Sequence, residues 1–166
     1  LRLIHRLDRD TSGLMVFALN YTAQRRLNEH LRERRFEKAY QAVVAGLVTE
    51  DEGTIELPIA PDWPNRPRQK ICHETGKPAR TDFRVLERDP ARERTRLLLM
   101  PVTGRTHQLR LHTSALGLPI PGCDLYAPPD VLGASERLLL HACGLGFPHP
   151  ETGASCRFKS ETPFRL

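Results

Sequence analysis

The sequence predicts an α+β fold built on a mostly antiparallel mixed sheet, with helices and loops at its flanks. Apolar segments of strand length occur in neighbouring pairs, while only two stretches show the spacing of an amphipathic helix. Paired strands with few helices between them are typical of antiparallel sheets. The chain has 166 residues, of which 39% are hydrophobic and 27% charged. This length and composition suit one folded domain with a buried core, so we treat residues 1–166 as a single domain.

The expected strands are apolar runs that end at turn-forming residues. Residues 13–19 form a continuous apolar run after a Thr-Ser-Gly turn signal, which favours a buried strand. Residues 38–46 have strand character and end at a glycine, and polar residues 88–92 separate two later strands. The full set of expected strands is 13–19, 38–46, 81–87, 95–102, 138–142 and 155–159.

Two helices are expected, at residues 21–35 and 106–116. In the first, Asn20 is a suitable N-cap, and Ala23, Leu27 and Leu31 recur every fourth residue on one stripe. Arginines cover much of its remaining surface. Binding of a polyanion and simple exposure to solvent explain these charges equally well. The second helix should stop at Gly117. Residues 58–80 are rich in proline and basic residues and contain the only tryptophan, so they predict an irregular segment or long loop.

Composition narrows the class of protein. Lys and Arg number 25 against 20 Asp and Glu, a net charge of +5 that permits a polyanionic partner if the basic groups cluster. The four cysteines form no Cys-x-x-Cys pair, which favours free thiols in a reducing compartment. No apolar run reaches the roughly 18 residues of a membrane span, so we expect a cytoplasmic protein without a membrane partner. No metal site is expected, because His107 and His112 are five residues apart with no Glu between them.

The densest group of chemically capable side chains is His-Arg-Leu-Asp-Arg-Asp-Thr-Ser-Gly at residues 5–13. A loop placed directly before a buried strand can point the carboxylate of Asp8 into a cleft. Spacing alone favours a structural role for the residues of this loop, because Asp, Thr and Ser commonly make turn and capping hydrogen bonds.

Two further motifs follow in the chain and change this balance. Glu-Lys-Ala-Tyr occupies residues 37–40, and Thr-Gly-Arg-Thr-His-Gln-Leu-Arg-Leu-His occupies residues 103–112, before Gly-x-Pro-Ile-x-Gly-x-Asp-x-Tyr at 117–126. With the loop at 5–13, these motifs resemble those of the RluA-type RNA pseudouridine synthases, whose first motif carries the essential Asp. Residues 58–83 are most similar to the RluA branch, which modifies large-subunit rRNA and the anticodon stem-loop of certain tRNAs. The resemblance implies the pseudouridine synthase catalytic fold and an RNA partner.

One departure concerns the start of the chain. Family members normally have some tens of residues before the Asp loop, including an Asn-Lys-Pro-x-Gly stretch. This chain begins at Leu1 without a Met, already inside a segment that is typical of a folded, motif-bearing region, and only four residues precede the first motif. We therefore expect a fragment that lacks the N-terminal strands of the catalytic domain.

The resemblance implies three catalytic residues, Asp8, Tyr40 and Arg105. Asp8 can act as a nucleophile at the sugar or as a base at the neighbouring carbon, and the sequence leaves both routes open. A carboxylate in a desolvated pocket needs a cation to stay ionised, so we predict an ion pair between Asp8 and Arg105. The alternative for Arg105 is an exposed phosphate contact. Tyr40 would stack on the uracil and move a proton, although a lone Tyr in a strand is more often core.

A base within a folded RNA must be flipped out to be reached, and Arg6 is the candidate to fill the gap, with a phosphate contact nearly as well supported. The full set of expected RNA-binding residues is His5, Arg6, Arg9, Arg66, Arg68, Lys70 and His107. The reaction involves no redox change, so no cofactor is expected, and a monomer is the default. The rival interpretation is a non-catalytic RNA-binding module or an inactive truncated synthase.

Overall fold

The computed structural model describes all residues, 1–166, and its centre is a seven-stranded mixed sheet. Six strands pair antiparallel, and β2 (Ser12–Gly13) adds to β10 in parallel. The order of the six across the sheet is β11 (Ser155–Lys159), β10 (Leu140–Pro148), β4 (Glu37–Ala45), β9 (Arg94–Pro101), β8 (Arg80–Asp89) and β5 (Glu52–Glu56). The predicted α+β class with a mostly antiparallel mixed sheet is confirmed.

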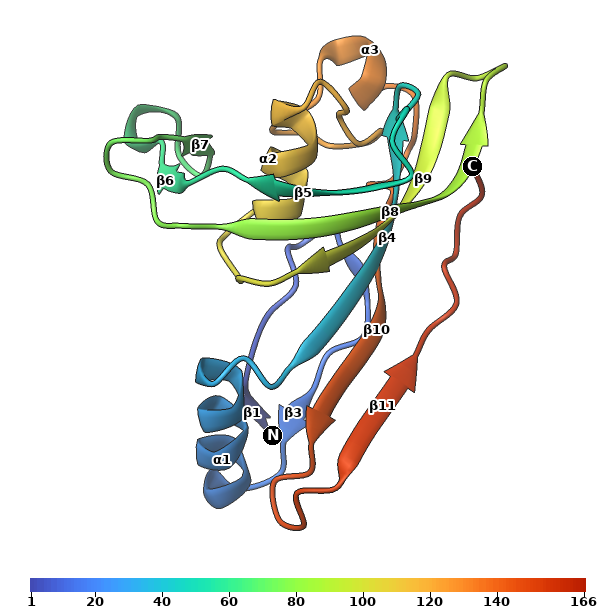
Figure 1. Cartoon of the computed structure of the whole chain (residues 1–166). Coiled ribbons are helices and arrows are strands. Elements are labelled where there is room, and N and C mark those ends of the chain that lie inside the picture. Colours follow the sequence, from blue (N-terminus) through green and yellow to red (C-terminus); the bar gives the residue numbers. More distant parts are fainter.

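Two short two-stranded sheets and three helices flank this sheet (Figure 1). Helix α1 (Tyr21–Arg32) lies at one end of the molecule, beside the pair β1 (Arg2–Leu3) and β3 (Phe17–Ala18). Helices α2 (Gln108–Ala115) and α3 (Pro129–Leu132) lie at the other end. The pair β6 (Ile59–Pro61) and β7 (Gln69–Ile71), joined by the 3-10 turn η1 (Trp63–Asn65), projects on the α2 side. No helix is long and apolar enough to cross a membrane.

The hydrophobic core has two parts that fix the two ends of the molecule. The larger part packs β4, β9 and β10 against α2 and the segment after it, with Val43, Leu99 and Ile120 almost fully buried. The smaller part lies under α1, where Ala23 and Leu27 pack on Ile4 and Ala18. Because Ile4 anchors the chain just before Asp8, the smaller core helps to position the predicted catalytic loop.

Helix α1 follows the sequence prediction closely. The Asn20 side chain accepts a hydrogen bond from Ala23 N at 2.8 Å, as expected of an N-cap. The helix ends at Arg32, three residues before the predicted end, because Arg34 adopts a left-handed backbone with φ of 57°. The second predicted helix is also present, shortened to Gln108–Ala115.

The strands differ from the prediction in three places. The run 13–19 is not one strand but divides into β2 and β3, because Gly13 (φ 120°) lies so close to β10 that a Cβ there would collide with the Ala142 carbonyl. The segment 58–80 contains the β6–β7 hairpin rather than an irregular loop. Strand β5 was not predicted, since its composition is polar and only Ile55 is buried.

Candidate active-site cleft

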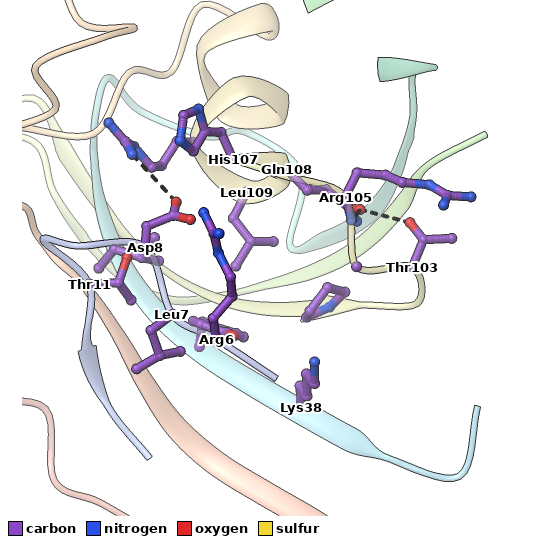
Figure 2. Close-up of a pocket in the computed structure, with 15 residues that line it drawn as sticks. Arg6, Leu7, Asp8, Thr11, Lys38, Thr103, Arg105, His107, Gln108 and Leu109 are labelled. Atoms are coloured by element: carbon purple, nitrogen blue, oxygen red, sulfur yellow. Dashed lines mark hydrogen bonds and ion pairs between the residues drawn. The ribbon is translucent and has the colours of Figure 1, made fainter. Parts of the chain in front are cut away.

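An open cleft lies where the loop before β2 meets β4 and the connection between β9 and α2 (Figure 2). Its empty volume is about 570 Å³, within the roughly 300–1,000 Å³ usual for ligand pockets. The loop is fixed at one end by the parallel pairing of Ser12 and Gly13 with β10, and it is tightened by a turn in which Thr11 N donates to Asp8 O at 3.0 Å. This turn holds Asp8 at the cleft.

Asp8 is paired with a buried arginine from α2. Arg110 Nη1 lies 3.4 Å from Asp8 Oδ2, and the side chains are 4% and 20% exposed, respectively. Arg110 also donates to Asp124 Oδ1 at 2.8 Å and to Cys123 Sγ at 3.3 Å. Burial disfavours the charged guanidinium, but the contact with Cys123 and the charges of Asp8 and Asp124 outweigh it, so the pKa of Arg110 is raised. Arg110 therefore stays charged and holds the Asp8 carboxylate in place.

The predicted ion pair between Asp8 and Arg105 is wrong. Arg105 donates through Nε to the Pro78 carbonyl at 3.0 Å and lies within ion-pair distance of no carboxylate. Its backbone N donates to Gln108 Oε1 at 3.0 Å, which fixes the turn into α2. Arg105 precedes the helix and lines the rim, whereas Arg110 is on the face of α2 that is buried against the loop. Which arginine reaches Asp8 depends on how α2 is oriented against the loop. The spacing of residues in the motif does not reveal that orientation.

Tyr40 lines the same cleft from β4. Its neighbour Lys38, two residues earlier on the same face of the strand, also lines it. Burial is the main reason that the pKa of Tyr40 rises to about 12, and the negative charge of Asp8 adds to the effect. At neutral pH the phenol is therefore protonated and can donate a hydrogen bond.

His107 connects the cleft to the β6–β7 hairpin. It precedes α2 with a left-handed backbone, φ 55°, and its Nδ1 lies 2.7 Å from the Tyr126 hydroxyl. The same hydroxyl accepts a hydrogen bond from Gln69 N in β7 at 2.8 Å. Burial lowers the pKa of His107, and the nearby Arg110 and Arg6 lower it further, although Asp8 opposes them. The imidazole is thus favoured in its neutral form.

The other predicted RNA-binding residues fall into three places. Arg6 lines the cleft, while His5 accepts from Val16 N at 3.1 Å and faces a neighbouring groove. Arg9 is largely exposed and pairs with Asp10 and Asp124. The hairpin residues are exposed on the surface: Arg66, Arg68 and Lys70.

The comparisons with known proteins identify the family of the chain. A family model described as RNA pseudouridylate synthase matches residues 1–115. The chain belongs to the RNA pseudouridylate synthase family. Proteins named dual-specificity RNA pseudouridine synthase RluA are similar over nearly the whole chain. The Yersinia pestis protein is 49% identical, with 97% of this chain and 78% of that protein covered. The Pasteurella multocida protein is 52% identical, with coverages of 96% and 73%.

Solved structures of the same family agree with the fold. Human RNA Pseudouridylate Synthase Domain Containing 1 superposes with a TM-score of 0.86 at 35% identity, covering 99% of this chain and 70% of that one. Human RNA Pseudouridylate Synthase Domain Containing 4 gives a TM-score of 0.78 at 25% identity, with coverages of 98% and 71%. Members of this family are isomerases, so the predicted family, fold and enzyme class are confirmed.

For an RNA pseudouridylate synthase, the most consequential residue that the sequence prediction missed is Arg110. A signal was available, because Arg110 stands in the third motif together with Arg105. Its burial could not be read from helix periodicity, since all residues from 108 to 113 are buried and α2 has no single apolar face over this stretch. The second motif contains Lys38 but predicts no role for it, although Lys38 lines the cleft.

Proposed function

We propose that residues 1–166 form a catalytic domain that converts specific uridines of structured RNA to pseudouridine, with Asp8 as the reacting carboxylate. The observation that carries the proposal is the geometry of Asp8, which is held by the buried Arg110 and faces the same cleft as Tyr40. The candidate substrates are large-subunit rRNA and the tRNA anticodon stem-loop, and the name dual-specificity RNA pseudouridine synthase, which two relatives carry, supports two kinds of RNA substrate. The domain acts in the cytoplasm as a monomer, without metal or cofactor.

The reaction is an isomerisation whose atoms balance. The bond from C1′ of the ribose to N1 of uracil breaks, the base turns within the cleft, and C1′ bonds to C5 instead. The proton on C5 is lost and N1 gains one, so no oxidant or reductant is needed. Asp8 either attacks C1′ or removes a proton from C2′, and Arg110 holds its carboxylate in place in both routes. Tyr40 stacks on the uracil and, as a neutral phenol, donates a hydrogen bond to it.

The arginines at the rim bind RNA rather than the reacting atoms. Arg105 has no acidic partner and contacts a phosphate beside the target nucleotide. Arg6 points into the cleft (Figure 2) and fills the space that the flipped base leaves in the RNA stack. His107 and the hairpin residues Arg66, Arg68 and Lys70 contact the RNA on the α2 side.

The test is pseudouridine formation in an rRNA hairpin and in a tRNA anticodon stem-loop, measured with the wild type and with Asp8→Asn. We expect product with the wild type on at least one RNA, and none with Asp8→Asn although it still binds that RNA. RNA binding without product by the wild type would reject the proposal in favour of a non-catalytic RNA-binding module.

A further inference from the structure

A second groove lies next to the active-site cleft and reaches the C-terminal end of α1. It is formed by three segments, 4–6 before the Asp8 loop, 31–38 at the end of α1 and the start of β4, and 101–105 between β9 and α2. Its empty volume is about 1,110 Å³, roughly twice that of the cleft. Because Arg6, Lys38 and Arg105 line both, this α1 groove is continuous with the cleft.

The α1 groove is strongly basic and carries no acidic side chain. Five cationic residues line it: Arg6, Arg32, Arg34, Lys38 and Arg105. None of the five takes part in an ion pair, whereas Arg35, directly after Arg34, is paired with Glu33 at 2.9 Å. Gathering like charges without counter-charges is unfavourable for the folded chain alone. A polyanion in the groove would remove this repulsion.

The end of α1 places one of these arginines in the groove at a cost in backbone energy. Arg34 N donates to Leu31 O and Arg35 N donates to His30 O, the pattern of a helix end at which the residue after the cap is usually glycine. Arg34 occupies that position with φ of 57°, a conformation unfavourable for a residue with a side chain. The sequence therefore has an arginine facing the groove where a glycine would be the stable choice.

The opposite side of the cleft is also basic. The β6–β7 hairpin carries exposed Arg66, Arg68 and Lys70, and the Tyr126 hydroxyl joins Gln69 of this hairpin to His107 in the cleft. The hairpin and α1 lie at opposite ends of the molecule (Figure 1). A strand whose nucleotide enters the cleft thus meets basic groups in both directions.

We propose that the α1 groove binds the phosphate backbone of the RNA strand that continues from the nucleotide in the cleft, with Arg32 and Arg34 as its outer contacts. The proposal deepens the proposed function and rests on it for the identity of the RNA. Among the arginines of α1 and the residues that follow it, the proposal assigns RNA binding to Arg32 and Arg34, while Arg25 and Arg35 lie outside the groove.

The experiment compares two double variants that remove the same charge from the same helix and its end. Arg32→Gln with Arg34→Gln removes the outer contacts of the groove, and Arg25→Gln with Arg35→Gln is the matched control. For each we measure the Kd for a labelled anticodon stem-loop across salt concentrations, and kcat and KM for pseudouridine formation. We expect the groove variant to raise Kd and KM about tenfold and to flatten the plot of log K against log salt by about 1.4, roughly 0.7 per lost single-strand phosphate contact, with kcat unchanged.

A third variant separates RNA binding from folding. Arg34→Gly relieves the left-handed backbone, so its Tm should rise while its affinity for RNA falls. The groove proposal is overturned if the two double variants bind RNA equally well, and in that case product formation by the wild type still supports the proposed function. If the wild type yields no pseudouridine but the groove variant alone binds more weakly, the proposed function fails and the groove stands as an RNA-binding surface.

Discussion

Replacing Arg110 by methionine tests the pairing on which the site depends. At 3.4 Å the interaction of the guanidinium with Asp8 amounts to about 5 kcal/mol for an effective dielectric constant of about 20. Desolvation of Arg110 and the partial exposure of Asp8 reduce the net value to roughly 2–3 kcal/mol. If that free energy is what keeps the carboxylate positioned for the reaction, kcat for pseudouridine formation should fall about 30- to 150-fold. Loss of buried hydrogen bonds to Asp124 and Cys123 should also lower Tm by roughly 5–10 °C.

The matched control is Arg105→Met, the same substitution at an arginine of the same cleft that touches no carboxylate. Its kcat should stay within about threefold of the wild type while KM rises, because only a phosphate contact is lost. Single-turnover rates well below Tm separate chemistry from unfolding. A normal kcat for Arg110→Met, or an equal loss of kcat in Arg105→Met, would refute the assignment of the two arginines.

Three further predictions follow from individual contacts. Tyr40→Phe keeps the ring but removes the phenol, so kcat should fall about 100-fold with KM unchanged, and a normal rate would limit Tyr40 to stacking. Burial, helped by the charge of Lys38, lowers the pKa of His5 to about 4, so the wild type should lose roughly 2 kcal/mol of stability, after discounting for partial exposure, as pH falls from 6.5 to 4. Urea titrations of His5→Gln should show a flatter pH dependence, and an identical one would contradict the cause. Gly13→Ala should destabilise the fold by about 2–4 kcal/mol, because its Cβ would collide with Ala142, whereas Gly117→Ala should lose only about 1 kcal/mol to its positive φ.

The sequence predicted the elements whose signals are local. The N-cap at Asn20 and the stripe through Ala23 and Leu27 are sufficient to place α1, because both depend on residues within two turns. The long strands β4, β8 and β9 were predicted near their observed bounds, since apolar content is visible along the chain. Features that depend on a partner far away in the sequence were not predicted. The break after Gly13 exists only because β10 lies against it.

The candidate site shows the same division. Asp8 and Tyr40 were found through motifs, and both line the cleft as expected. The cation that pairs with Asp8 was assigned to the wrong arginine, because a motif gives the order of residues but not the face of the helix on which they lie. The sequence also left open whether the arginines of α1 bind RNA or only face solvent. These arginines became distinguishable only when the structure placed Arg32 and Arg34 in the α1 groove.

Helix α2 explains why the site and the core of this fold are inseparable. It has three large polar residues that are nearly fully buried, and together they bond the segments that surround the cleft. Gln108 bonds the turn at residues 103–105 and the start of β8. Arg110 bonds the Asp8 loop and Asp124, and His112 bonds Thr81 and the Leu57 carbonyl. Because a buried polar group left without its partner is costly, these three side chains fix the relative positions of the loops that carry the chemistry. A substitution of any of these three residues should therefore reduce stability and activity together, whereas one on the rim should change RNA binding alone.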